Sequence, residues 1–232
     1  MPAERQIGTV YVTGGSSGLG AAVVAAVTKA GGQPAVIDLH PPEDSSLPYA
    51  AADLSDSAAA AHAVAELIEQ VGPPSALVTA AGTDACGPLA DIGTETWERV
   101  VRVNLFGTAS VVRACLPALE AAGGTVVTVA STLGLRPAGD ATAYCASKFG
   151  VVGFTRALAM ELAGRVGVTL LVPGGMRTAF FDGRTPQYQP GPDAQLNDPA
   201  HVADVVLLAL RQPPGCELRE VVVASSTEPS WP

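Results

Sequence analysis

Short apolar segments of strand type alternate with longer helical segments along almost the whole chain, and this alternation restricts the fold most. The expected strands are residues 7–13, 34–39, 75–82, 124–131, 166–174 and 219–225, and the expected helices are residues 18–32, 56–72, 94–122, 141–164 and 199–212. The strand segments lack a clean polar alternation, which is typical of a sheet covered on both faces. Their alternation with helices predicts parallel β–α–β units. We therefore expect an α/β fold, with a doubly wound parallel sheet of about seven strands and helices on both faces.

One folded domain is expected to account for the chain, because 232 residues suit a single α/β domain with a large core. No composition shift, repeat or low-complexity tract marks a boundary, so residues 1–232 are expected to form that one domain. A polar loop rich in Pro and Ser runs to about Ala52, and residues 176–198 look like an insertion. Residues 94–122 predict one long or broken helix, with Thr94 as its N-cap and Glu95 in its first turn.

Charge and cysteine content argue against several classes of partner. A net charge of −9 and a pI near 4.7 argue against nucleic acid and anionic membrane surfaces, which both need a basic face. No apolar run approaches the roughly 18 residues that span a membrane. We also expect no signal peptide, because residues 1–12 read as a direct lead into a strand. Cys86, Cys115, Cys145 and Cys216 form no C-x-x-C pair, so we expect no metal site and a reducing, cytoplasmic location.

The segment that follows the first strand fits two functional motifs at once. Residues 14–18 read G-x-S-x-G, the nucleophile elbow of a serine hydrolase, with Ser16 as the nucleophile. Gly14, Gly18 and Gly20 also fit a glycine-rich turn that holds a dinucleotide pyrophosphate at the start of a helix. Both motifs need a strand, a tight turn and a helix, so other residues have to decide between them.

Later residues favour the cofactor interpretation. A hydrolase elbow needs a histidine further along the chain, and His40, His62 and His201 all suit solvated or helix-surface positions better. Asp38 ends the second strand, where a carboxylate accepts hydrogen bonds from an adenosine ribose and repels a 2′-phosphate. No arginine or lysine lies in the glycine turn or just after Asp38 to offset this repulsion. The sequence therefore predicts NAD(H) in preference to NADP(H).

A tyrosine, a lysine and a serine supply the candidate chemistry. Tyr144 and Lys148 lie four residues apart on one expected helix, so they share a face. A nearby ammonium favours the phenolate and is expected to lower the tyrosine pKa from its usual value of about 10. Ser131 ends the preceding strand and can hydrogen-bond a substrate oxygen. Together with the glycine turn, these residues form a specific constellation.

With these residues the chain resembles the short-chain dehydrogenases/reductases, from about Ile7 to Val223. The family's Thr-Gly-x-x-x-Gly-x-Gly motif begins here at Thr13, and its Asn-Asn-Ala-Gly strand end appears as residues 79–82 with both asparagines replaced. The resemblance implies a Rossmann-type fold. The catalytic residues that it implies are Asn104, Ser131, Tyr144 and Lys148. The cofactor-binding set is Gly14, Ser16, Ser17, Gly18, Leu19, Gly20, Asp38, Asp53, Leu54, Ala80, Ala81, Gly82, Tyr144, Lys148, Pro173, Gly174 and Thr178.

The resemblance also implies a mechanism, which is hydride transfer between a nicotinamide and a small or medium secondary alcohol or ketone. Tyr144 would exchange the hydroxyl proton, and Ser131 would position the oxygen. Lys148 would lower the tyrosine pKa and bind the nicotinamide ribose, while Asn104 would hold a water that links Lys148 to solvent. The alternatives are a catalytically silent dinucleotide sensor or scaffold of the same fold and, more distantly, the hydrolase that uses Ser16.

Two further expectations concern surfaces around the site. The helices at 94–122 and 141–164 look too apolar for the sheet alone, so we expect a homodimer or homotetramer, with Ala157, Leu158 and Leu162 available to a second copy. Residues 176–192 stand where the family has its substrate lid. Phe180, Phe181 and Tyr188 would roof an apolar substrate or simply pack on the domain, and Arg136 would meet an anionic substrate group or lie on the surface.

Overall fold

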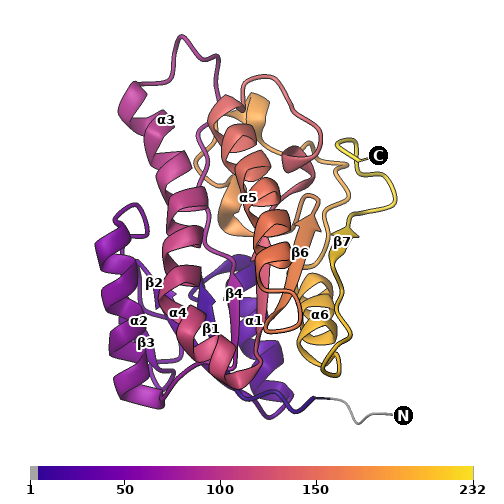
Figure 1. Ribbon diagram of the computed structural model, residues 1–232. Coiled ribbons are helices and arrows are strands. Elements are labelled where there is room, and N and C mark those ends of the chain that lie inside the picture. Colours follow the sequence, from indigo (N-terminus) through magenta and orange to yellow (C-terminus); the bar gives the residue numbers. More distant parts are fainter. Residues whose placement is uncertain (1–4, 232) are drawn as a thin grey trace.

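The computed structural model describes residues 5–231 and contains one seven-stranded sheet (Figure 1). The strand order is β3-β2-β1-β4-β5-β6-β7, and every pairing is parallel. The strands are β1 (Thr9–Thr13), β2 (Gln33–Asp38), β3 (Tyr49–Ala51), β4 (Ala76–Thr79), β5 (Thr125–Val129), β6 (Gly167–Pro173) and β7 (Glu220–Val223). The expected α/β fold with a doubly wound parallel sheet is therefore confirmed.

Helices cover both faces of this sheet. The helices are α1 (Gly18–Lys29), α2 (Ser57–Val71), α3 (Thr94–Val101), α4 (Thr108–Ala122), α5 (Thr142–Glu161) and α6 (Pro199–Leu210). In Figure 1, α2, α4 and α5 lie in front of the sheet, and α1 and α6 lie behind it. Each layer has its own apolar core, one around Tyr11, Leu77 and Leu119 and the other around Val12, Val23 and Val206. Apolar residues on both faces explain why the strands lack polar alternation.

The strand order reverses beside β1, which pairs with β2 on one side and with β4 on the other. From β1 the sheet is built outward through β2 and β3 on one side and through β4 to β7 on the other. The helical connections therefore diverge at this point, and a crevice opens at the carboxyl ends of β1 and β4. In open α/β sheets this switch point is where ligands bind. The glycine turn follows β1 at this edge, and the residues predicted for catalysis follow β5 at the same edge.

Some element boundaries differ from the sequence-based expectation. The Pro- and Ser-rich loop contains the short edge strand β3, which the sequence does not predict because the loop has no apolar run of strand type. The helix at 94–122 starts at Thr94, so its N-cap is Gly93 and the prediction of Thr94 as the cap is wrong. A π-helical segment, Arg102–Gly107, interrupts this helix and joins α3 to α4. Two 3₁₀ turns, Ala179–Phe181 and Pro186–Tyr188, lie within residues 176–198, the segment that looks like an insertion.

The helical stretch Thr94–Ala122 is long and apolar enough to cross a membrane by length and composition alone. The expectation that no segment comes near this threshold was therefore too strong. Val111, Cys115 and Leu119 of α4 belong to the core in front of the sheet. Packing inside the fold buries 33% of the most apolar 18-residue window of this stretch.

Candidate active site

A cavity of about 1000 Å³ runs along the carboxyl ends of the strands. The glycine turn and Asp38 line one end, and Ser131 and Tyr144 line the other. The predicted residues on its wall are Gly14, Ser17, Gly18, Leu19, Asp38, Asp53, Leu54, Ala80, Ala81, Gly82, Ser131, Tyr144, Lys148, Pro173, Gly174 and Thr178. Of the predicted set, Ser16, Gly20 and Asn104 lie outside this lining in the described chain.

The glycine turn is shaped by close backbone contacts. Gly14 has φ of +68°, and a Cβ there would lie 2.7 Å from the Ala81 Cα atom. A Cβ on Gly20 would collide with the Gly14 carbonyl, so this glycine lets α1 start directly against the turn. Ser17 caps α1 with its backbone only, because its side chain makes no capping hydrogen bond within the described residues. The open helix N-terminus and a free hydroxyl therefore face the cavity, a favourable setting for a phosphate.

Ser16 has a structural role in this turn. Its hydroxyl donates to the His40 carbonyl oxygen at 2.6 Å, and its N–H donates to an Asp38 carboxylate oxygen at 3.0 Å. The other Asp38 oxygen accepts from the His40 N–H at 3.1 Å. Ser16 thus ties the glycine turn to the end of β2. The interpretation of Ser16 as a nucleophile receives no support, and its expected contact with phosphate would have to come at the expense of these bonds.

Asp53 is held in place beside the same end of the cavity. A hydrogen bond from the backbone N–H of Ser55 lowers the pKa of Asp53. The ion pair between Asp53 and Arg99 lowers this pKa as well. The Arg99 guanidinium lies 3.1 Å from the Asp53 carboxylate and also donates to the Ser55 hydroxyl. Both partners are partly exposed, so the pair orients the carboxylate more than it stabilises the fold.

Ser131, Tyr144 and Lys148 meet at the opposite end. Ser131 follows β5, and the other two lie one turn apart on α5. The Lys148 Nζ atom is buried, donates to the Val129 carbonyl oxygen at 2.9 Å, and lies 5.6 Å from the centre of the Tyr144 ring. The expected grouping of these three residues is therefore present in the structure.

The pKa values at this end differ from the sequence-based expectation. Burial raises the pKa of Tyr144 to about 12, and a hydrogen bond from Ser131 only partly opposes this shift. Burial also lowers the pKa of Lys148 to about 8. The expectation that the lysine ammonium lowers the tyrosine pKa is wrong for this structure, because desolvation of the phenolate dominates. At neutral pH Tyr144 is therefore a protonated phenol, ready to donate.

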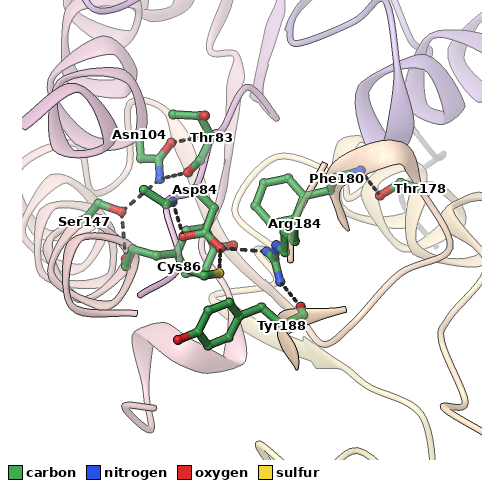
Figure 2. Close-up of polar contacts among 11 residues, drawn as sticks. Thr83, Asp84, Cys86, Asn104, Ser147, Thr178, Phe180, Arg184 and Tyr188 are labelled. Atoms are coloured by element: carbon green, nitrogen blue, oxygen red, sulfur yellow. Dashed lines mark hydrogen bonds and ion pairs between the residues drawn. The ribbon is translucent and has the colours of Figure 1, made fainter. Parts of the chain in front are cut away.

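Asn104 lies behind the wall and supports it. It belongs to the π-helical segment and is fully buried. Its amide oxygen accepts from the Thr83 N–H at 2.8 Å, and its amide nitrogen donates to the Thr83 carbonyl oxygen and the Ser147 hydroxyl, as Figure 2 shows. The side chain therefore fixes the loop after β4, and neither of its amide hydrogens is left for the water that it is expected to hold.

The altered strand end at 79–82 keeps its geometry through other bonds. Thr13 accepts from the backbone N–H groups of Ala80 and Ala81, so the two residues predicted to bind the cofactor have their N–H donors already in use. Thr79 stands where the family has its first asparagine, and its buried hydroxyl is left without a hydrogen bond among the described residues. Gly82 still lines the cavity beside Lys148 and Asn104.

Aromatic residues of the lid, residues 176–192, lie against Tyr144 and line the cavity. The centres of the Tyr144 and Phe180 rings are 5.7 Å apart, and Phe180, Phe181 and Tyr188 all line the cavity. Arg136 is exposed and lies outside the lining in the described structure, which favours the surface interpretation.

A charged pair that the sequence did not reveal fastens the lid. Arg184 donates to Asp84 at 2.6 Å, and the exposed fractions of the two side chains are 18% and 8%. The guanidinium also lies over the rings of Phe180 and Phe181. It donates to the Tyr188 carbonyl oxygen as well, as Figure 2 shows. Asp84 follows β4, so this pair connects the lid to the strand end that Asn104 supports.

Comparison with known proteins agrees with this geometry. A family model described as short chain dehydrogenase matches residues 8–189. A 2-dehydro-3-deoxy-L-rhamnonate dehydrogenase (NAD(+)) of Sphingomonas sp. strain SKA58 is 36% identical over 77% of this chain and 75% of its own. The D-threitol dehydrogenase of Mycolicibacterium smegmatis is 33% identical over 66% of this chain and 64% of its own. The ligand-free aldohexose dehydrogenase of Thermoplasma acidophilum superposes with a TM-score of 0.83 at 21% identity, over 94% and 93% of the two chains.

Proposed function

The chain belongs to the short chain dehydrogenase family, and on this premise we propose that it transfers a hydride between a nicotinamide dinucleotide and a secondary alcohol or ketone of small or medium size. One observation carries the proposal. A single cavity has an open helix N-terminus and a carboxylate at one end, and Ser131 with Tyr144 at the other. A nicotinamide dinucleotide has groups that match both ends of this cavity. Its phosphates suit the helix N-terminus, and its nicotinamide ring has to lie beside Tyr144.

The described residues fit such a cofactor. The uncapped start of α1 and the Ser17 hydroxyl would hold the pyrophosphate, and Asp38 would hold the adenosine ribose. Lys148 would bind the ribose at the reactive end. When bound, the nicotinamide supplies or accepts the hydride, and the protein contributes orientation and proton transfer.

The proton is handled by Tyr144. In ketone reduction its phenol donates to the substrate oxygen, and in alcohol oxidation its phenolate accepts the hydroxyl proton. Ser131 lies at the end of β5 and hydrogen-bonds the same oxygen, which polarises the carbonyl. Lys148 is held by the Val129 carbonyl oxygen and faces the ring of Tyr144.

The substrate class follows from the lid and the relatives. Phe180 and Phe181 roof the catalytic end, while the guanidinium that lies over them is neutralised by Asp84. The names of the two sequence relatives point to small hydroxylated compounds. We therefore favour small hydroxylated alcohols and ketones over large substrates.

Turnover measurements test the proposal. Purified protein is assayed with NAD⁺ and a panel of secondary alcohols and diols, and with NADH and the matching ketones, by absorbance of the reduced nicotinamide. Turnover of at least one pair in both directions is the expected result. Cofactor binding without turnover of any panel member would favour the silent sensor instead.

Replacement of Asp38 by Ala tests the cofactor preference. We expect the wild-type protein to bind NADH more tightly than NADPH, because a 2′-phosphate would meet the Asp38 carboxylate. Asp38→Ala should narrow this difference by about tenfold or more, as removal of one close charge repulsion changes binding by over 1 kcal/mol. Fluorescence titration with both reduced cofactors measures it. Equal or tighter binding of NADPH by the wild type contradicts the assignment.

We also propose that the protein forms a dimer or tetramer through α4 and α5. Leu158 and Leu162 belong to the buried core, so their expected role at an interface is wrong. Phe149, Gly153, Ala157 and Met160 are instead exposed along one face of α5. A closed, isologous contact would cover this face. Met160→Glu should shift the assembly toward monomer in light scattering, and a wild-type protein that is monomeric at micromolar concentration would contradict the proposal.

The cysteines bear on location. All four are free thiols in the described structure. This state supports our proposal of a reducing, cytoplasmic compartment.

A further inference from the structure

The segment that follows β7 folds back into the cavity. Thr227, Glu228, Pro229 and Ser230 contribute to its lining. One Glu228 carboxylate oxygen accepts from the Gly175 N–H at 2.9 Å, and the other accepts from the N–H and the hydroxyl of Ser230. Sequence patterns gave no sign of this contact, because residues 224–231 have neither periodicity nor a motif. The segment nonetheless adds a carboxylate to the wall.

The carboxylate lies at the catalytic end. Gly174 and Gly175 follow β6 directly, and a Cβ on Gly174 would collide with the Glu228 carboxylate. Ser230 is hydrogen-bonded to Thr132 at 2.7 Å, and Thr132 is the neighbour of Ser131. Because β5 and β6 are paired, both anchor points of the segment lie beside the serine that orients the substrate oxygen.

The reacting ring of a dinucleotide has to lie at this same end, since its carbon exchanges a hydride with the carbon whose oxygen meets Ser131 and Tyr144. The charges of Arg184 and Asp84 at this end offset each other. Lys148 supplies an opposing positive charge and donates to the Val129 carbonyl oxygen. Glu228 and the exposed Asp193 of the segment 176–198 both line the cavity without an ion-pair partner among residues 5–231. Of these two carboxylates, Glu228 is the one held against Gly175, directly after β6.

We propose that Glu228 strengthens the binding of oxidised nicotinamide dinucleotide relative to the reduced form. This inference rests on the proposed function. The oxidised ring carries one positive charge and the reduced ring carries none, whereas phosphates, riboses and adenine are common to both forms. A carboxylate beside the ring therefore attracts only the oxidised form.

Binding measurements on Glu228→Gln test this inference without turnover. Glutamine keeps the size of the side chain and an acceptor for the Gly175 N–H, but it removes the charge. Calorimetry with NAD⁺ and fluorescence titration with NADH give the two dissociation constants. We expect the ratio of Kd for NAD⁺ to Kd for NADH to rise about three- to tenfold, the range for unit charges at a partly hydrated site.

Two variants serve as controls. Glu220→Gln removes the same charge from β7 at an exposed site paired with Arg156, and should leave the ratio unchanged. Glu228→Asp keeps the charge, and should keep the ratio near the wild-type value even if both constants weaken. Should Glu228→Gln unfold, Glu228→Ala takes its place, because it removes the charge without bringing an amide donor against the Gly175 N–H and Ser230. A raised ratio in that variant supports the inference, and an unchanged ratio overturns it.

The outcomes separate the inference from the proposed function. If Glu228→Gln weakens the binding of both cofactor forms equally, the ratio of the two dissociation constants does not change and the segment has a purely structural role. That result overturns the inference, and so does a variant that binds both forms as the wild type does. If the wild-type protein binds neither cofactor form, the proposed function itself fails. Binding of both forms with normal turnover and no change in ratio leaves the proposed function standing and removes only the role of Glu228.

Discussion

Replacement of Tyr144 by Phe should lower turnover by about 10²–10⁴-fold, the usual range for loss of a general acid or base. The binding of NADH should change only slightly, because the substitution removes one hydroxyl and leaves the ring against Phe180 and Lys148. Steady-state kinetics and a fluorescence titration of the same preparation measure the two quantities. Collapse of turnover with retained cofactor binding places the tyrosine in the chemical step.

Ser16→Ala is the matched control, because it also removes one hydroxyl near the cavity. Its hydroxyl donates to the His40 carbonyl oxygen, so we expect a modest effect that falls mainly on cofactor binding. Lys148→Ala should damage both binding and turnover, since that side chain has a role in each. An oxidoreductase activity that survives Tyr144→Phe and disappears in Ser16→Ala at unchanged NADH affinity would refute the proposed mechanism.

The raised pKa of Tyr144 also fixes the direction of the pH dependence. Oxidation needs the phenolate, and reduction needs the phenol. With a pKa of about 12 for the free protein, kcat/KM for alcohol oxidation should rise with pH across the whole range in which the protein stays folded. Ketone reduction should not lose its proton donor over the same range. A plateau of oxidation near pH 7 would show that burial does not control this group.

The parts that sequence predicted well are those set by local geometry. The spacing of Tyr144 and Lys148 fixes them on one helix face, and Ser131 and Asp38 are fixed by the ends of β5 and β2. The pKa of Tyr144 could not be predicted in this way, because it depends on how deeply the lid and α5 bury the phenol. Glu228 reaches the cavity through a chain reversal after β7, which no periodic pattern specifies.

The Asp84–Arg184 pair shows the same limit, since its partners are separated by 100 residues in the sequence. Each residue alone reads as ordinary surface charge. Only the packing of the lid on the loop after β4 brings them together and excludes water from both. Their contact depends on the tertiary structure, and its removal is expected to have a large effect on kcat/KM.

Replacement of Arg184 by Met should lower kcat/KM by about 10- to 100-fold, mainly through KM, because it frees the lid that positions Phe180 over Tyr144. The variant leaves the Asp84 carboxylate without its partner at a site that is 8% exposed. Such a loss costs several kcal/mol in a rigid core. Here the two 3₁₀ turns of the lid bury no residue, so the segment can open locally and the global unfolding temperature should change little.

The exposed pair Arg177–Asp198 at the base of the same lid is the control. Its charged atoms are 3.8 Å apart, and the exposed fractions of the side chains are 67% and 44%. A pair of this kind contributes about 0–1 kcal/mol, so Arg177→Met should leave kcat/KM within a few-fold of the wild-type value. Protease sensitivity of the lid should rise in Arg184→Met and stay unchanged in Arg177→Met.

Charge effects on Tyr144 distinguish positioning by this pair from a purely structural role. The Asp84 charge raises the pKa of Tyr144 and the Arg184 charge lowers it. Arg184→Met should therefore move the pH profile of alcohol oxidation to higher pH, and Asp84→Asn should move it to lower pH. In the double variant the two shifts should largely cancel, while the coupling in kcat/KM should amount to about 0.5–3 kcal/mol. Shifts in the same direction for both single variants would mean that lid displacement alone, without the charges, sets the acidity of the tyrosine.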